Sequence, residues 1–600
     1  MCYGLPTCRC SANNAHRPSF ALECKYAEIH GRILKKILKF AYFPNDYAYD
    51  KILFSIFAAY RLVFNKFPMA KLNIGMSFSG GGYRAATFHL GTLSFLDYVQ
   101  VSEGKTLLDC VSVMSTVSGG TITGLKYMLA LAQKQAINVM VRELFDFLYN
   151  EDLVEDAFTN IEKGRTDYGV SLIKIMASIY DAKLFSQSVM GNLMDCVNDI
   201  PIKHFSANAT DFDNGLPFRF QVTEGRIIDD KKSTYGVFGN SNHRLNRDIA
   251  QHITLGEALA CSSCFPCGFE PMMFPDDFNV CKNEIAAKKD SFGIMDGGIV
   301  DNQGIEPILL AEERMHKCDK ERTDKALELI IISDVSISDM DGYSPCKQTL
   351  PESIGKRTIA KLQKYALFAE IIISLLLIIA FFVNNHYLIG AIIVIWGMVT
   401  IANVALHWID KKIVGLLSDT IIGKNASFIN HLSFADIESL LMNRAKSVIM
   451  MSSSVFLKRI RKMSYDTLYN DKDWQNRLVT NTIYELRAGE KWASRFKNGT
   501  LADYLQPSMA IQENSSKAAN METTLWFTEK DKATGVPEAI LAAGQYTICY
   551  NLLDYIEKIE KNGDNLNENH QMIIACKQQL QDAWKKFQED PLWMVPKFKE

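Results

Sequence analysis

Ser118 is the residue of this sequence best placed to act as a nucleophile. It follows a short apolar run, Cys110–Val117, that predicts a buried strand, and it precedes apolar residues at helical spacing from Thr121 to about Ala132. A serine at a sharp strand-to-helix turn holds its hydroxyl at the N-terminus of the helix. We expect Gly119 and Gly120 to permit the unusual backbone angles of such a turn and to keep side chains out of its way. The alternative is an ordinary junction in which Ser118 only caps the helix.

A glycine-rich turn upstream could stabilise negative charge. The alternating segment Lys71–Phe78 predicts a strand, and a helix is expected from Ala85 to about Val99. The turn between them contains Gly80, Gly81 and Gly82. Unobstructed backbone N–H groups at a helix N-terminus suit a phosphate or the oxyanion of an acyl-transfer intermediate. The spacing is not GxGxxG, and the Lys-Ser/Thr pair of a P-loop is missing, so acyl transfer is favoured over nucleotide binding.

Asp296 is the candidate general base. It ends an apolar segment and is followed by Gly297 and Gly298, which would let the carboxylate approach another part of the backbone closely. A partly buried aspartate beside a serine hydroxyl can accept its proton directly. A plain Asp-Gly turn is the alternative. His89 falls inside the helix after the glycine turn, where a structural role is expected.

Five sequence blocks in order resemble the patatin-like phospholipases, which use a Ser–Asp dyad without histidine. The blocks are SGGGYR, STVSGG, NATDFDNGLPFRF, ALACSSCFPCGFEP and DGG, and the resemblance runs from about Leu72 to Val335. It implies a lipid acyl hydrolase with Ser118 as nucleophile, Asp296 as base and the amides of Gly80, Gly81 and Gly82 as oxyanion donors. It also implies that Arg84 orients the loop or meets a lipid phosphate.

Two positions depart from the family pattern, and one motif invites another interpretation. Thr116 stands at the first glycine position of GxSxG, and Ala85 replaces a glycine that often follows the arginine. Cys261, Cys264 and Cys267 form CxxCxxC, but no second ligand pair lies at a spacing suited to zinc. The resemblance assigns these cysteines to small packing positions, and no metal or cofactor is expected.

The composition limits the classes of function. With 600 residues the chain is expected to form two to four units. A net charge of -3 argues against a nucleic-acid partner. The 14 cysteines show no disulfide spacing, which predicts reduced thiols and a protein that faces the cytosol.

Two long apolar segments predict a transmembrane helical hairpin. Tyr365–Val383 carries one charge, Glu370, and Tyr387–Ile409 carries none. Basic residues flank the pair and are missing from its turn: Lys356, Arg357, Lys361, Lys364, Lys411 and Lys412. Both termini and the catalytic domain are therefore predicted to be cytoplasmic. A further basic and apolar segment, His30–Phe43, predicts an amphipathic helix that either packs on the domain or lies on an anionic membrane.

The predicted architecture is an α/β three-layer sandwich with a mainly parallel sheet, a transmembrane hairpin and a helical C-terminal part. The expected divisions are an N-terminal segment at 1–69, a catalytic domain at 70–345, the hairpin at 365–409 and the C-terminal part at 413–600. Leu327–Ile332 is expected to be a buried parallel strand. Met521–Phe527 and Pro537–Ile556 are expected to be a strand and a helix that complete the catalytic domain.

The sequence thus predicts a membrane-anchored serine lipid acyl hydrolase whose partners are phospholipid and the bilayer. A homo-oligomer is compatible with this prediction. Two alternatives stay open: a membrane scaffold with an inactive hydrolase fold, and a hydrolase of non-phospholipid esters or thioesters.

Overall fold

The computed structural model describes most of the chain after residue 71. The described residues are 72–161, 165–166, 169–224, 238–266, 268–279, 291–318, 327–336, 342–347, 349–383, 385–418, 431–561 and 568–595. The amphipathic helix predicted at 30–43, with the whole N-terminal segment, lies outside them.

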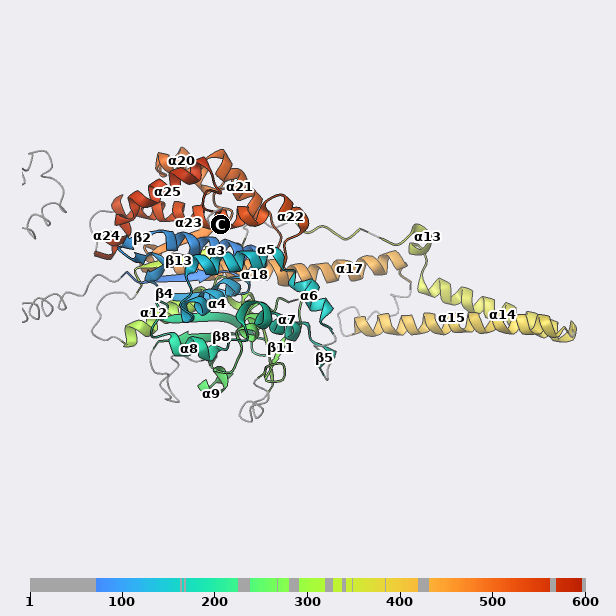
Figure 1. The fold of residues 1–600 in the computed structure, drawn as a ribbon. Coiled ribbons are helices and arrows are strands. Elements are labelled where there is room, and N and C mark those ends of the chain that lie inside the picture. Colours follow the sequence, from blue (N-terminus) through green and yellow to red (C-terminus); the bar gives the residue numbers. More distant parts are fainter. Residues whose placement is uncertain are drawn as a thin grey trace, which may run out of the picture. The chain divides into compact units, whose positions relative to one another are not determined.

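Five parallel strands form the centre of the sheet (Figure 1). Their order is β7 (His204–Asp211), β4 (Val111–Val117), β1 (Ile74–Phe78), β13 (Leu329–Asp334) and β14 (Leu478–Thr482). β1, β4 and β13 are buried along their whole length, as expected for apolar, β-branched strands covered on both faces. The parallel strands predicted around Ser118 and at Leu327–Ile332 are confirmed.

Antiparallel strands extend the sheet beyond β7. β8 (Leu216–Thr223), β9 (Phe238–Gly239) and β10 (Arg244–Leu245) follow β7 in order. β12 (Phe292–Asp296) also pairs antiparallel with β7, and β11 (Met272–Phe274) pairs with β12. The C-terminal end of β12 therefore lies against the strand that neighbours β4.

Helices cover both faces of the sheet, and the side chains of β13 show the two layers. Leu329 and Ile331 belong to the large core beneath α3 (Gly82–Tyr98) and α4 (Gly119–Ala132). Ile330 and Ile332 belong to a smaller core shared with α12 (Ile305–Cys318) and α18 (Phe456–Asn470). Because neighbouring side chains of a strand point to opposite faces, the sheet is the middle layer of three.

The remaining helices surround these layers. Those between α4 and β7 in the sequence are α5 (Ile137–Asn150), α6 (Leu153–Thr159), α7 (Leu172–Tyr180), the π-helical turn η3 (Asp181–Phe185) and α8 (Met190–Cys196). α9 (Arg247–Ala250), α10 (Leu255–Ser262) and α11 (Gly298–Asp301) lie between β8 and α12 in the sequence. The C-terminal helices are α20 (Lys491–Lys497), α21 (Met509–Ala519), α22 (Glu529–Ala533), α23 (Val536–Lys561), α24 (Glu568–Ala575) and α25 (Lys577–Glu589).

The C-terminal part completes the catalytic domain, but with different residues from those predicted. β14 adds the parallel edge next to β13, and α23 confirms the helix expected at Pro537–Ile556. The strand predicted at Met521–Phe527 is wrong, because these residues form no strand. Their backbone pairs instead with the glycine turn, where the Thr524 carbonyl accepts a hydrogen bond from the Tyr83 N–H at 2.8 Å.

Two glycines bring α23 and α3 into backbone contact. A Cβ atom on Gly544 would lie 2.0 Å from the Phe88 carbonyl oxygen, and one on Gly91 would lie 2.0 Å from the Leu541 carbonyl oxygen. We expect Gly544→Ala to lower the free energy of unfolding by at least about 2 kcal/mol, because the two backbones must separate. Thermal unfolding beside Gly342→Ala, whose Cβ would meet nothing within 4 Å, checks this. Equal melting temperatures for the two variants would contradict it.

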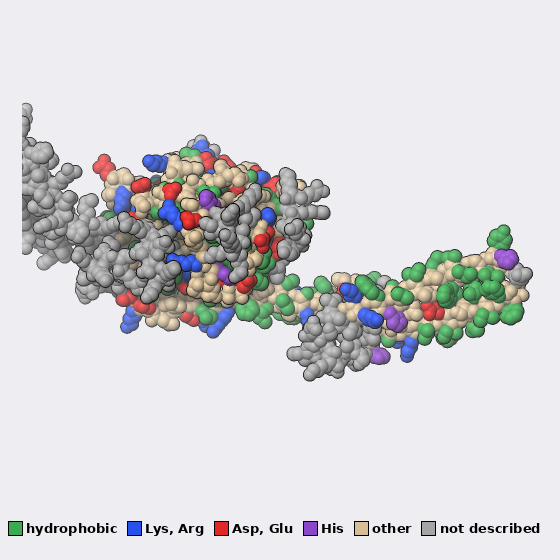
Figure 2. Space-filling model, turned by 90° about the horizontal axis from the view of Figure 1, so that it is seen from below, with side chains coloured by type: hydrophobic (Ala, Val, Ile, Leu, Met, Phe, Trp, Pro, Cys, Tyr) green, Lys and Arg blue, Asp and Glu red, His purple; other side chains and the backbone are tan. Residues whose placement is uncertain are grey.

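Two long apolar helices separate β13 from β14 in the sequence. α14 (Ile359–Val383) and α15 (His386–Ser418) contain the segments Ala360–Val383 and His386–Trp408, with hydropathies of 2.9 and 2.2. Only 6% and 0% of their most apolar windows are buried, so they are not core helices of the described structure. Figure 2 shows them covered by hydrophobic side chains. By length and composition, both are able to cross a membrane.

Candidate active site

Ser118 occupies a strained turn between β4 and α4. Its backbone angles are φ 50° and ψ -120°, which a residue with a side chain rarely adopts and which cost on the order of 1–3 kcal/mol. Its N–H donates to Ser262 Oγ at 3.0 Å, and that hydroxyl donates to the Asn208 carbonyl at 2.7 Å. The predicted turn is therefore present, and Ser262 braces it from α10.

Of the two reasons predicted for Gly119 and Gly120, the structure agrees with the lack of side chains and not with the unusual backbone angles. The unusual angles belong to Ser118 itself, whereas the two glycines allow the neighbouring turn to approach. A Cβ on Gly119 would lie 2.1 Å from the Gly82 carbonyl oxygen, and one on Gly120 would lie 2.7 Å from that of Phe78. Side chains here would force the glycine turn away from Ser118.

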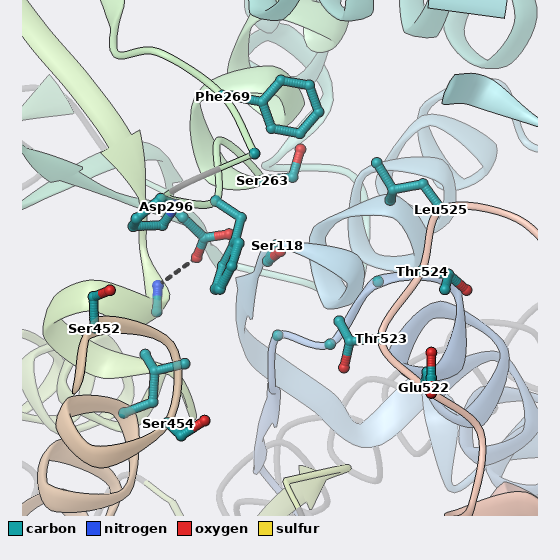
Figure 3. Close-up of a pocket in the computed structure, with 18 of the residues that line it drawn as sticks. Ser118, Ser263, Phe269, Asp296, Ser452, Ser454, Glu522, Thr523, Thr524 and Leu525 are labelled. Carbon is teal, nitrogen blue, oxygen red and sulfur yellow. Dashed lines mark hydrogen bonds between the residues drawn. The ribbon is translucent and has the colours of Figure 1, made fainter. Parts of the chain in front are cut away.

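Asp296 lies beside Ser118 at the end of β12 (Figure 3). The side chain is buried, and its Oδ1 accepts a hydrogen bond from the Gly298 N–H at 2.6 Å. Burial raises the pKa of Asp296 to about 6, although hydrogen bonds from Gly298 and from the Ser118 hydroxyl favour the charged form. A Cβ on Gly297 would lie 2.4 Å from the Asn208 carbonyl oxygen, so the turn needs a glycine there. The structure thus brings the two predicted residues together.

The glycine turn presents two amides rather than three. The Gly80 N–H donates to the Asn302 carbonyl at 3.0 Å and is occupied. The N–H groups of Gly81 and Gly82 make no hydrogen bond within the part of the chain that the structure describes. Their φ angles of 141° and 57° are conformations that favour glycine. The predicted set of donors is therefore reduced to Gly81 and Gly82.

His89 holds the glycine turn and does not act as a base. Its Nε2 lies 3.1 Å from the Ser79 carbonyl, which can only accept, so this nitrogen carries the proton. Its Nδ1 then accepts from Ser333 Oγ at 2.9 Å. Complete burial lowers the pKa of His89 to about 3, which keeps the ring neutral. The structural role expected from the sequence is confirmed.

Arg84 positions a loop from the C-terminal part. Its guanidinium donates to the Met521 carbonyl at 2.5 Å and to Thr523 Oγ1 at 3.3 Å. The side chain is buried, and burial lowers its pKa to about 10, so it remains charged. The loop that Arg84 contacts is not the glycine loop named in the prediction, and its two predicted roles stay predictions.

A cavity of about 1110 Å³ contains Ser118, Asp296 and the glycine turn. The catalytic domain supplies one wall, which includes Phe265, Phe269 and Ile299. The loop 522–526 and a helical segment after the long apolar helices supply the others. Figure 3 shows Thr523, Thr524 and Leu525 on one side of Ser118, and Ser452 and Ser454 on another.

Sequence reasoning missed the residues that brace and line this site. Ser262 lies inside a block that carries the resemblance and Asn302 lies four residues after the last block, but no spacing marks them as neighbours of Ser118 and Gly80. The loop 522–526 carries no motif, and its composition alone predicts a strand that the structure does not contain.

The cysteine motif lies in the wall of the core. Cys261 Sγ contacts Met272 Sδ at 3.5 Å, and Cys264 Sγ donates to the Glu270 carbonyl at 2.9 Å. Burial raises the pKa of both thiols well above the usual value, so they are protonated. Cys267 lies outside the described residues. These contacts agree with packing positions.

The sequence around this site matches a known family model. Residues 76–309 match the model of the patatin-like phospholipases. The chain contains a patatin-like phospholipase domain. This match includes the glycine turn, Ser118 and Asp296. It ends before the long apolar helices.

Two of the solved structures with distant similarity to this chain are a human and a bacterial protein. Human GIVD cytosolic phospholipase A2 is 14% identical, with a TM-score of 0.27, over 44% of this chain and 43% of that one. VipD from Legionella pneumophila is 12% identical, with a TM-score of 0.21, over 87% of each chain. This chain thus spans less than half of the human protein. None of the curated proteins matches the sequence.

Proposed function

We propose that the protein is a membrane-anchored lipid acyl hydrolase of the phospholipase A type that uses a Ser118–Asp296 dyad. One observation carries the proposal. The strained Ser118 lies beside a buried carboxylate and two glycine amides that no described residue pairs with, in a cavity large enough for an acyl chain. The family match supports lipid hydrolysis in general.

The reaction proceeds in two steps. Asp296 takes the proton of Ser118 Oγ as this oxygen attacks the ester carbonyl carbon, and the resulting oxyanion receives hydrogen bonds from Gly81 and Gly82. The C–O bond to the lysolipid breaks, and the departing oxygen takes the proton from Asp296. A water molecule, deprotonated by Asp296, then attacks the acyl carbon. The bond between this carbon and Ser118 Oγ breaks, Oγ takes the proton back from Asp296, and the fatty acid leaves. Each oxyanion donor contributes on the order of 3 kcal/mol in comparable sites.

The long apolar helices support the anchoring part of the proposal. We place α14 and α15 across the bilayer, with the basic flanks and the catalytic domain on the cytoplasmic side. The Glu370 carboxylate accepts a hydrogen bond from Asn403 Nδ2 at 3.3 Å, which satisfies a polar group between the two helices. Anchoring keeps the active site near its substrate and raises the effective concentration of lipid.

The pH dependence of hydrolysis follows from the burial of Asp296. The base must be ionised, so we expect kcat/KM on a soluble short-chain ester to rise about tenfold per pH unit below pH 6. It should level off above that value. If the pKa of Asp296 had its ordinary value of 3.8, kcat/KM would already reach its plateau at about pH 5. An inflection near pH 4 would therefore argue against a buried Asp296 as the base.

Release of fatty acid from reconstituted vesicles tests the proposal. Wild-type protein should release fatty acid from phosphatidylcholine vesicles, and Ser118→Ala should not. Release of acyl groups only from thioesters or short esters would favour the non-phospholipid hydrolase. Binding of lipid without release of any acyl group would favour the scaffold.

A further inference from the structure

The helical segment that follows the apolar hairpin exposes large hydrophobic side chains that none of the described residues covers. We call this segment the portal helix. It consists of α17 (Phe434–Met450), the π-helical turn η7 (Met451–Val455) and α18 (Phe456–Asn470). Ten of its large hydrophobic side chains are between 40% and 66% exposed: Leu440, Leu441, Met442, Val448, Ile449, Met451, Val455, Phe456, Met463 and Tyr469. Positions 441, 448, 451 and 455 are separated by seven, three and four residues, so they lie on one side.

The charge of the portal helix is of one sign over most of its length. No Asp or Glu occurs from 439 to 465, whereas six basic residues do: Arg444, Lys446, Lys458, Arg459, Arg461 and Lys462. An apolar side combined with uniformly basic charge is typical of a helix that lies on an anionic lipid surface. An interface with a second protein copy would bring these like charges together, which is unfavourable.

The first residues of the portal helix contact the residues just before the first membrane-spanning candidate. The Phe434 N–H donates to the Arg357 carbonyl at 2.9 Å, and Ser433 forms a β-bridge with Thr358. These contacts lie two to three residues before Ala360, the first residue of the apolar span. Since α14 is proposed to enter the bilayer there, the first turn of α17 lies at the membrane surface.

The other end of the portal helix is fixed to the active site. Arg461 Nε donates to the buried Asp334 at 2.9 Å, and the Tyr465 hydroxyl donates to the same carboxylate at 3.1 Å. Asp334 ends β13, and the Ser336 N–H donates to its other oxygen at 2.8 Å. The Ser336 hydroxyl in turn accepts a hydrogen bond from the side-chain amide of Asn302. The backbone carbonyl of Asn302 accepts a hydrogen bond from the Gly80 N–H. The position of α18 is thereby tied to the glycine turn.

A second side of the portal helix forms a wall of the catalytic cavity. Met450, Ser454 and Leu457 line the space that contains Ser118. The π-helical turn lies between Met450 and Leu457, and its extra residue shifts the register of the side chains. One helix therefore presents apolar side chains both to the outside and to the cavity.

We propose that the outer side of the portal helix rests in the headgroup region of an anionic membrane and forms the route by which phospholipid passes from the bilayer into the cavity. The lipid-entry part of this inference depends on the proposed hydrolase function. The contact with lipid does not depend on it. Exposed Val448, Met451, Val455 and Phe456 would enter the acyl boundary, while the exposed Arg459 and Lys462 meet lipid phosphates.

Photocrosslinking in proteoliposomes tests the lipid contact without requiring activity. A benzophenone side chain is introduced at Val448 or Phe456 of the full chain, with the exposed Gln578 on α25 as the matched control position. In vesicles of phosphatidylcholine and phosphatidylserine, we expect phospholipid adducts at positions 448 and 456 at least fivefold above position 578. Charge reversal at Arg459 and Lys462 should reduce these adducts severalfold. Adducts to a second copy of the chain, or lipid adducts no more frequent than at 578, would overturn the proposal.

Hydrolysis measurements separate lipid entry from catalysis. Val448→Asp and Phe456→Asp leave the cavity lining unchanged, so hydrolysis of a soluble short-chain ester should stay within twofold of wild type. Hydrolysis of vesicle phospholipid should fall at least fivefold. Equal rates on vesicles would overturn the entry route. A wild type without hydrolysis on either substrate, but with the expected adducts, would refute the hydrolase and leave the lipid contact standing.

Discussion

Replacement of Asp296 by asparagine is expected to remove hydrolysis and to stabilise the protein. The asparagine oxygen can still accept the Gly298 N–H, but it cannot take a proton from Ser118. Loss of a general base costs up to about 10⁴-fold in rate, so we expect at least about 10³ here. Rates on a soluble ester and on vesicle phospholipid should fall together.

The stabilising effect of Asp296→Asn should depend on pH. The folded protein raises the pKa of Asp296 from 3.8 to about 6, so ionisation disfavours the folded state. Wild-type stability therefore falls as pH rises from about 4 to 6 and stays lowered above that range. The pKa shift lowers the free energy of unfolding of the wild type by about 3 kcal/mol at neutral pH. The neutral asparagine side chain would restore this free energy.

Thermal unfolding at pH 4 and pH 7.5 measures this effect. The asparagine variant should melt well above wild type at pH 7.5 and close to it at pH 4. A variant that is inactive but no more stable at pH 7.5 would contradict the assigned cost of burying the charge. An active variant would move the base to another residue.

A second large decrease in kcat is expected for Gly81→Ala. The φ angle of 141° is rarely adopted by residues with a side chain, and the new Cβ would lie 2.6 Å from Val335 Cγ2. The turn must therefore move, and its free amides lose their alignment with Ser118. Loss of an oxyanion donor costs about 10²–10³-fold in kcat, and we expect a decrease of that size.

A matched control for Gly81→Ala is Gly104→Ala. Gly104 also has a positive φ, 72°, but its Cβ would meet nothing within 4 Å, and it lies in the turn between β2 (Gln100–Ser102) and β3 (Lys105–Thr106). Both variants carry the backbone cost of a positive φ, but only the first displaces the oxyanion donors. Equal rates for the two would show that Gly81 contributes no more than local stability.

Local patterns identified the central part of the fold and the two catalytic candidates. β13 is a continuous apolar run, β4 combines apolar with small hydroxyl residues, and β1 lies in an alternating segment. The glycines beside Ser118, Gly80 and Asp296 mark places where backbones approach closely. Signals of this kind lie within a few residues and can be seen in a sequence.

Contacts over long sequence distances could not be predicted in the same way. The occupied Gly80 amide depends on Asn302, and the loop held by Arg84 lies 437 residues further along the chain. The wrong strand at Met521–Phe527 has the same cause, because its threonines and aromatic residues favour an extended backbone but do not reveal its hydrogen-bond partner. β14, which takes the sheet edge instead, is a mixed segment with few apolar residues.

The central claim is that Ser118 is an activated nucleophile, and covalent labelling tests it most directly. Wild-type protein, Ser118→Ala and Asp296→Asn are treated with a fluorophosphonate, and intact mass and peptide mapping locate the adduct. The account predicts a single adduct on Ser118 in wild type, no adduct in Ser118→Ala and labelling at least about 10²-fold slower in Asp296→Asn. An adduct on another serine, or equal labelling of Asp296→Asn and wild type, would contradict it.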